Sequence, residues 1–297
     1  MPLLQPPNVL PKGMFLIDQV LLHRRRPVPR DDLRALVQPS TLPLRQGGTS
    51  TFDACLKALR DLDLVRVEEH TQGEALSRHP DSPAVPDVLT FYTLLLQRAV
   101  LQAPHDLESA AQRDLLTALT WWCAQDPHAA PIEWSKVQEL LGHDLGADFT
   151  SFPIGNTNPW QSFTRWALVL GFAEQESVGE GAPARLVPDI TRALKRILTS
   201  RAAPGVVRAQ DFLTLVRECL PVVDGGRLAV QMRPHWNVPD RRAVAGAVDR
   251  ALSHAILRCA EDGLVELDSL SDAAKVNLSD AERIFSFSHV RIQEREA

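Results

Sequence analysis

Residue types that catalyse reactions or bind metals are scattered along this 297-residue sequence. The nine histidines are isolated, and the four cysteines form no CxxC pair and have no histidine at metal spacing. No Walker lysine follows a glycine loop, and the sequence has no GxSxG, HExxH or GxGxxG motif. We therefore expect no enzyme, no cofactor and no metal site. Buried thiols in a reducing compartment are expected at Cys55, Cys123, Cys219 and Cys259.

Basic residues gather in the run HRRRPVPR, which begins at His23. Residues 1–45 hold seven basic and three acidic residues, whereas residues 258–297 hold five basic and nine acidic ones. The net charge of the whole chain, −5, argues against nonspecific coating of DNA as its main task. Two interpretations of the run stay open: a solvated helix end, where cations suit the helix dipole, or a contact with the DNA backbone or an acidic partner.

The composition is that of a folded protein, with 44% hydrophobic and 23% charged residues. The length favours two or three domains. No stretch of about 18 consecutive apolar residues is present, and the first residues do not have the pattern of a secretory signal. We expect a cytoplasmic protein that does not cross a membrane.

Three segments share one pattern: an amphipathic helix, a break of two or three residues, and a short strand. They read FDACLKALRDLDLVRVEEH from Phe52, SFTRWALVLGFAEQES from Ser162, and AVDRALSHAILRCAEDGLVELDS from Ala247. The junctions between helix and strand, near Asp63, Gly171 and Gly263, lie about 100 residues apart. This spacing fits whole small domains rather than solenoid repeats.

Further elements are expected around each segment. Helices are predicted over residues 12–24 and 29–37, 106–125 and 132–141, and 209–220, and the last is followed by VVDGGRLAVQM, which predicts a turn leading into a strand. Return strands are predicted near Ala75, Leu186 and Phe285. A helix that runs directly into a strand and a return strand resembles the end of a winged-helix module. We therefore expect a mainly α fold with short β hairpins (α+β), built from tandem winged-helix (helix-turn-helix) domains over residues 1–86, 87–203 and 204–297.

The first of the three helices has a clear core face, made by Phe52, Cys55, Leu56 and Leu59, with Thr49 or Ser50 as N-cap. Its outward face is predicted to carry Thr51, Lys57, Ala58 and Arg60. The preceding GGTST phrase is either a plain turn or a helix N-terminus whose amides touch a DNA phosphate. The six tryptophans favour packing in cores or between domains over stacking on bases.

The candidate binding residues follow from these faces and from the basic run. Nucleic-acid contacts are predicted at Arg24, Arg25, Arg26, Arg30, Thr51, Lys57 and Arg60. Partner contacts on the third helix and the loop before it are predicted at Arg241, Arg242 and Arg250.

Several phrases also resemble a known family. They are LLQPPNVLPKGM, LVQPSTLP, FDACLKALRDLDLV, LPVVDGGR and FSFSHVRI, and together they are similar to DpdG, a component of bacterial gene clusters that place deazaguanine bases in DNA and restrict unmodified DNA. The resemblance implies a role in antiviral defence beside other proteins of the cluster, an ATPase or helicase and a nuclease. It transfers no active site.

The residue patterns indicate a non-catalytic adaptor that binds double-stranded DNA, other proteins, or both through its winged-helix domains. The resemblance implies that it works in an anti-phage defence complex with an ATPase or nuclease partner. One alternative is a DNA-binding transcriptional regulator, although no obvious dimer helix is present to read two half-sites. A hydrolase with an unfamiliar site is the third class. Turnover by the pure chain would reveal it.

Overall fold

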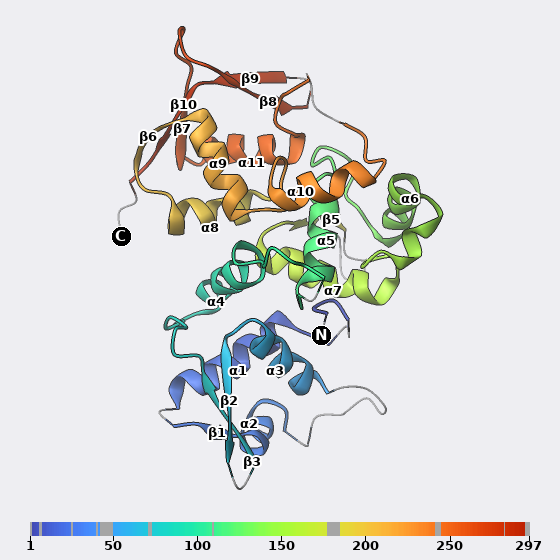
Figure 1. Ribbon diagram of the computed structural model, residues 1–297, viewed down its shortest axis with the longest axis vertical. Coiled ribbons are helices and arrows are strands. Elements are labelled where there is room, and N and C mark those ends of the chain that lie inside the picture. Colours follow the sequence, from blue (N-terminus) through green and yellow to red (C-terminus); the bar gives the residue numbers. More distant parts are fainter. Residues whose placement is uncertain are drawn as a thin grey trace. The chain divides into compact units, whose positions relative to one another are not determined.

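The computed structural model in Figure 1 describes residues 2–5, 8–24, 26–39, 41, 50–70, 73–108, 110–176, 185–240, 245–281 and 283–294. The described chain has the expected α+β character, with helices and small antiparallel sheets. It divides into two compact units, one made of Met1–Leu115 and Asn156–Val169, the other of Leu116–Gly155 and Leu170–Ala297. Domain boundaries at residues 86 and 203 stay a prediction.

None of the helices in the described ranges is both long enough and apolar enough to cross a membrane.

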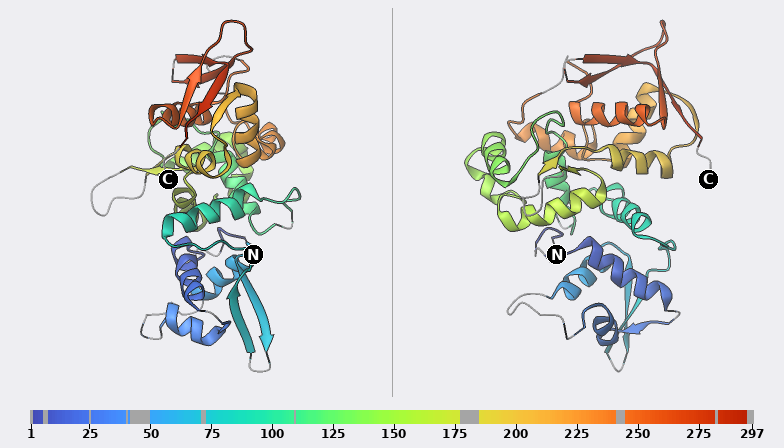
Figure 2. Two further views of the ribbon diagram at one scale, coloured as in Figure 1. Left: turned by 90° about the vertical axis from the view of Figure 1, so that its left-hand side faces the viewer. Right: turned by 180° about the vertical axis from the view of Figure 1, so that it is seen from behind.

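The first unit begins with three helices and three strands. In chain order they are α1 (Pro11–His23), β1 (Val28–Pro29), α2 (Arg30–Val37), α3 (Thr51–Asp61), β2 (Val65–His70) and β3 (Gly73–Arg78). The strands form one antiparallel sheet in the order β1–β3–β2, with Val28 opposite Leu76 and Val65 opposite Arg78. Strand β3 packs against α1 and α2, and β2 packs against α3 (Figure 2). The predicted helices over 12–24 and 29–37 and the strand near Ala75 are confirmed.

Helix α3 is fixed at its start by a side-chain cap. Ser50 is the N-cap, and its Oγ accepts a hydrogen bond from the Asp53 amide at 3.1 Å, as the sequence predicts. Thr49, the other predicted cap, and the glycines of the GGTST phrase lie outside the described residues. The predicted core residues Phe52, Cys55, Leu56 and Leu59 are all buried.

The prediction that Ala58 faces outward is wrong, because its side chain is 1% exposed. Ala58 lies one turn after the buried Ala54, so the two alanines widen the apolar face of α3 to the side of Leu59 and Leu62. The small side chains of Ala54 and Ala58 allow this wider face to pack closely.

The rest of the first unit holds α4 (Val88–Leu96), the π-helical turn η1 (Gln97–Leu101), the start of α5 (Arg113–Trp122) and most of α7 (Thr157–Leu170). Asp87 caps α4 through hydrogen bonds from the amides of Leu89 and Thr90. The helix predicted over 106–125 begins only at Arg113. At its start the Asp114 carboxylate accepts hydrogen bonds from the amides of Leu3 and Leu4, which anchors the buried beginning of the chain.

The second unit holds the remaining elements. They are the end of α5, α6 (Trp134–Leu145), the 3-10 helix η2 (Gly146–Ser151), β4 (Glu174–Gln175), β5 (Leu186–Val187), α8 (Thr191–Arg201), β6 (Gly205–Arg208), α9 (Ala209–Cys219), α10 (Arg227–Met232), the 3-10 helix η3 (Arg233–His235), α11 (Arg250–Glu261), β7 (Val265–Asp268), β8 (Val276–Asp280), β9 (Arg283–Phe287) and β10 (His289–Ile292). Strands β6, β10 and β7 form a three-stranded antiparallel sheet in that order, and β8 pairs with β9.

Two predictions for this unit need correction. The strand predicted in VVDGGRLAVQM is a helix, α10, because Gly226 lies so close to Pro221 that the carbonyl of Pro221 accepts the amide hydrogens of Leu228 and Ala229 in its first turn. Phe285 does lie in a strand, but this strand is β9 of the β8–β9 hairpin. The return strand of the three-stranded sheet is β10, which begins after Ser288.

Tryptophans fill the interior, as predicted. Trp121, Trp122, Trp160 and Trp166 are buried. Within the second unit the indole N–H of Trp121 donates to Asp144 Oδ2 and that of Trp122 donates to the Phe172 carbonyl, each at 2.8 Å. Such paired indole groups are typical of core tryptophans rather than of a base-stacking surface.

The three predicted junctions share one backbone conformation. Asp63, Gly171 and Gly263 have φ values of 54°, 85° and 70°, in the left-handed region. After α3 and α11 the closing hydrogen bonds correspond: the Leu64 amide donates to the Leu59 carbonyl at 2.8 Å, and the Leu264 amide donates to the Cys259 carbonyl at 2.9 Å. This six-to-one bond around a left-handed residue ends the helix and turns the chain into the next strand.

A similar order of elements occurs in three stretches of the described chain: helix, strand, helix, helix, strand, strand. The first stretch runs from α1 to β3. The second has α5, α6, α7, β4 and β5, and in the place of its first strand it has the single residue Ile132, which forms an isolated bridge to Leu186 of β5. The third has α8, β6, α9, α11, β7 and β10, with α10 and the β8–β9 hairpin inserted. The strand order also corresponds, as β1–β3–β2, Ile132–β5–β4 and β6–β10–β7. In each stretch the last strand lies between the other two.

Candidate functional site

The exposed side of α3 and the beginning of α2 form a charged surface, which we call the α3 surface. Its members are Arg30, Arg34, Asp53, Lys57, Arg60 and Asp61. On α3 these residues recur at helical spacing on the side opposite the core. Between α2 and α3 lies a cavity of about 280 Å3, lined in part by Arg30, Lys57 and Arg60. Three residues predicted to contact nucleic acid therefore lie together.

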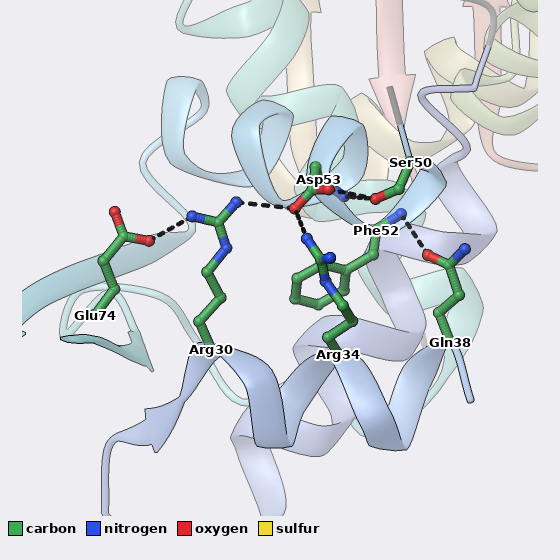
Figure 3. A network of polar contacts seen from close by, with 7 residues as sticks. All are labelled: Arg30, Arg34, Gln38, Ser50, Phe52, Asp53 and Glu74. Carbon is green, nitrogen blue, oxygen red and sulfur yellow. Dashed lines mark hydrogen bonds and ion pairs between the residues drawn. The ribbon is translucent and has the colours of Figure 1, made fainter. Parts of the chain in front are cut away.

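A network of hydrogen bonds crosses this surface (Figure 3). Oδ1 of Asp53 accepts from Nη2 of Arg30 at 2.8 Å and from Nη2 of Arg34 at 2.5 Å. The other terminal nitrogen of Arg30, Nη1, donates to Glu74 Oε2 on β3 at 2.8 Å. The second oxygen of Asp53 accepts from the Ser50 hydroxyl at 2.5 Å. One carboxylate on α3 thus holds two arginines of α2.

These contacts change the titration of both partners. Burial works against the charged form of Asp53, yet hydrogen bonds from Ser50, Arg30 and Arg34 outweigh it and lower the pKa of this carboxyl below 3.8. The hydrogen bond to Asp53 raises the pKa of Arg30. Both shifts favour the charged forms of Asp53 and Arg30, whose charges compensate one another within the protein.

Arg34 also packs on an aromatic ring. Its guanidinium carbon lies 5.3 Å from the ring centroid of Phe52, a cation–π distance. The Phe52 amide donates to Gln38 Oε1 at 3.3 Å. Arg34 and Gln38 therefore bind the end of α2 to the start of α3, so the arginines of this surface hold the fold together as well as carrying charge.

The other nucleic-acid residues predicted on α3 differ in their ion pairs and in the surface on which they lie. Nζ of Lys57 lies 3.5 Å from Oδ1 of Asp61, which is one turn further along α3. Arg60 is exposed, and no ion pair joins it to any described residue. Thr51 is half-buried and lines a separate, mainly apolar groove of about 490 Å3 beside α1, together with Leu16 and Phe52. Thr51 is therefore not part of the α3 surface.

The neighbouring hairpin adds mixed charge. Arg66 on β2 is exposed, and the same hairpin carries Glu68, Glu69 and Glu74. A hairpin that contacts a DNA backbone is normally rich in cations. The acidic residues of β2 and β3 therefore weaken the attraction of this surface for phosphate.

Arg24 and Arg26 lie elsewhere in the first unit. Both line a cavity of about 750 Å3 formed by the end of α1, β1 and α2. Arg25 lies outside the described residues. The described nucleic-acid candidates thus lie in three places: the α3 surface, this cavity, and, for Thr51, the apolar groove beside α1.

Of the predicted partner contacts, Arg250 is described, whereas Arg241 and Arg242 lie outside the described residues. Nη1 of Arg250 donates to Asp126 Oδ2 at 2.5 Å, and its side chain is 27% exposed. Nearby, Arg233 donates to Asp249, the N-cap of α11, at 2.7 Å. Arg250 therefore pairs within the second unit.

The described residues contain no group of three or more histidine, cysteine, aspartate or glutamate side chains that could hold a metal. Burial raises the pKa of the Cys55 thiol to about 11 and that of Cys259 to about 12, and it raises the pKa of Cys123 as well. These thiols stay protonated at neutral pH and are weak nucleophiles.

The roles of Arg34, Asp53 and Glu74 were not predicted from the sequence. One local signal existed: Arg30 and Arg34 are one helical turn apart, so they lie on the same side of α2. Asp53 and Glu74 follow Arg30 by 23 and 44 residues, and no local pattern connects residues at such separations.

Comparison with known proteins agrees with the resemblance seen in the sequence. The model of the DpdG-like family matches residues 1–273. No curated protein and no solved structure matches the chain. Since the family match covers all but the last 24 residues, the chain belongs to the DpdG-like family.

Proposed function

We propose that the protein is a non-catalytic adaptor built from three winged-helix modules. The observation that carries the proposal is the threefold recurrence of one element order with one strand order, β1–β3–β2, Ile132–β5–β4 and β6–β10–β7. A helix pair followed by a hairpin whose last strand pairs with the strand after the first helix is the winged-helix arrangement. In a winged-helix module the last helix before the hairpin faces the ligand. In the three proposed modules this helix is α3, α7 and α11, respectively.

Family membership supports the context of the proposal. The chain belongs to the DpdG-like family, and this membership implies a place in the gene clusters that put deazaguanine bases in DNA and restrict unmodified DNA. We propose that the chain works in the defence complex of such a cluster, bound to an ATPase, helicase or nuclease encoded beside it. Modules that bind DNA or other proteins suit this role better than an enzyme does.

The α3 surface is the proposed site of contact with double-stranded DNA. Arg60 and Arg66 have no ion-pair partner among the described residues, and Lys57 has only an exposed intrahelical one. Arg30 and Arg34 are compensated by Asp53 and Glu74. We therefore propose weak binding to DNA that depends on salt and ignores sequence, as suits an adaptor held in place mainly by proteins.

The experiment is a DNA titration with the purified full-length chain at salt concentrations from about 50 to 200 mM. The proposal predicts weak binding that falls steeply with salt and is lost in the variant Lys57→Glu/Arg60→Glu. The matched control, Arg201→Glu, changes an exposed arginine at the end of α8 and should bind like the wild type. Tight binding that prefers one sequence would instead support a transcriptional regulator.

A further inference from the structure

The cavity beside Arg24 and Arg26 combines free cations with an apolar wall. Among the described residues that line it, His23, Arg24 and Arg26 are basic and Asp32 is acidic. No carboxylate among the described residues pairs with Arg24 or Arg26, and both side chains are exposed. The cavity therefore carries positive charge that the described part of the protein does not compensate, in contrast to the α3 surface.

The wall of this cavity is apolar where α2 meets β1. Leu36 is 53% exposed although it is a large hydrophobic residue, and it lies beside Ala35 and the nearly buried Val28. The volume of about 750 Å3 is large enough to hold several side chains of a bound segment. Covering Leu36 would remove apolar surface from water, which favours binding of another apolar group.

The cavity lies on the other side of α2 from the α3 surface. Arg30 and Arg34 contact Asp53 of α3, whereas Asp32 and Leu36 line the cavity. Asp32 follows Arg30 by two positions, and Leu36 follows Arg34 by two positions. Each therefore lies about 200° around the helix axis from the arginine that precedes it. One ligand at the α3 surface and another in the cavity would therefore not compete for the same face of α2.

We propose that this cavity docks a segment of a partner protein in which acidic residues flank a large apolar side chain. The carboxylates of the segment pair with Arg24 and Arg26, and its apolar side chain covers Leu36. The inference rests on the proposed adaptor role, since it names the chemistry of one partner. It also gives the first unit two separate binding faces, as an adaptor requires.

Two observations favour a protein segment over a DNA backbone here. Phosphate sites commonly use backbone amides, but Pro27 and Pro29 in the wall have no N–H to donate. A phosphate backbone also has no apolar side chain to cover Leu36. Charge and shape therefore match an acidic segment with an apolar anchor.

The test measures binding of a labelled synthetic peptide to the full-length chain by fluorescence anisotropy. The peptide holds one leucine between runs of aspartate and glutamate, and two further peptides replace either the leucine by serine or the acids by their amides. The expected result is that the first peptide binds and that each change weakens binding at least about ten-fold.

Variants of the protein test whether the peptide binds in the cavity. Arg24→Glu/Arg26→Glu and Leu36→Ser should each weaken binding at least about ten-fold, whereas Lys57→Glu/Arg60→Glu and Arg201→Glu should not. The changed side chains in the cavity are exposed, so circular dichroism should show all variants folded. Leu36→Ser keeps every charge, so it tests the apolar contact separately.

Three outcomes overturn the inference. They are failure of the acidic peptide to bind, equal binding by the cavity variants, and loss of DNA binding in Arg24→Glu/Arg26→Glu while peptide binding stays. The last result would make the cavity a nucleic-acid contact. None of them affects the adaptor proposal, which depends on the protein's complex with its partner and is measured separately.

Discussion

Asp53 of α3 and Arg30 of α2 are joined by a hydrogen bond of 2.8 Å between Oδ1 and Nη2. The same oxygen also accepts from Arg34, so one carboxylate contacts two cations, and Glu74 pairs with the second terminal nitrogen of Arg30. These residues lie where a winged-helix module would meet DNA. Asp53 therefore both connects the two helices and limits the attraction of the α3 surface for phosphate.

Replacing Asp53 by asparagine should strengthen binding to double-stranded DNA. The change removes one negative charge, so Arg34 loses its ion pair while Arg30 keeps the one with Glu74. Affinity at low salt should therefore rise by several-fold to about ten-fold, with a steeper salt dependence. DNA titration by gel shift at several salt concentrations measures this. Asp81→Asn removes a charge from an exposed residue outside the network and serves as the control. Equal DNA affinity of Asp53→Asn and the wild type would show that the network does not restrain binding.

The stability that Asp53 contributes should depend on pH in one direction. Its folded pKa lies below the ordinary value of 3.8, so its contribution is fully present above the unfolded pKa and is lost as the pH falls through the folded pKa. Urea unfolding of the wild type and Asp53→Asn should give a constant difference in the free energy of unfolding above about pH 5, and this difference should shrink below about pH 4. A difference that grows as the pH falls would contradict the network described for Asp53.

A buried ion pair fixes the sheet of the first unit to α1. Nε of Arg78 donates to Oδ1 of the fully buried Asp18 at 2.7 Å, and Nη2 of Arg78 donates to the Pro83 carbonyl. Asp18→Ala leaves a largely buried guanidinium without its counter-ion and should lower the free energy of unfolding by about 3–5 kcal/mol.

The double variant Asp18→Leu/Arg78→Met provides the control for this pair. It replaces both charges by apolar side chains and should recover at least about half of the loss. Urea unfolding followed by circular dichroism measures both variants. If Asp18→Ala is as stable as the wild type, the pair does not hold α1 to β3.

The two glycines among the three junction residues, Gly171 and Gly263, should differ in their tolerance of alanine. Both have positive φ, which costs alanine about 1–2 kcal/mol. At Gly171 an added Cβ would also lie 2.7 Å from the Ala193 amide nitrogen, whereas at Gly263 no atom lies within 4 Å of it. Thermal unfolding should therefore show a larger loss for Gly171→Ala than for Gly263→Ala. The reverse order would mean that the close approach of Gly171 to α8 is not a constraint.

The local features of the fold were predictable from the sequence. Hydrophobic spacing located the core face of α3, Ser50 was recognised as a helix cap, and the breaks at Asp63, Gly171 and Gly263 all proved to be left-handed helix ends. Each of these features depends on residues close together in the chain. Local periodicity and turn chemistry are sufficient to indicate them.

Features that depend on distant residues were missed. Alanine is compatible with either face of a helix, so the burial of Ala58 depends on what packs against it. The helix α10 forms because Pro221 lies against its first turn, and the late start of α5 coincides with hydrogen bonds from the chain's beginning to Asp114. The candidate site was missed for the same reason, because Arg30 contacts Asp53 and Glu74 only in the folded chain.

As a non-catalytic adaptor, the chain should form a stable complex with a partner protein and should catalyse no reaction of its own. The most direct test mixes the purified 32.9 kDa chain with the proposed ATPase partner and measures mass by size-exclusion chromatography with light scattering. The expected result is one species whose mass includes both proteins, and no ATP hydrolysis or DNA cleavage by the chain alone. Two separate species, together with turnover by the chain alone, would contradict the adaptor role.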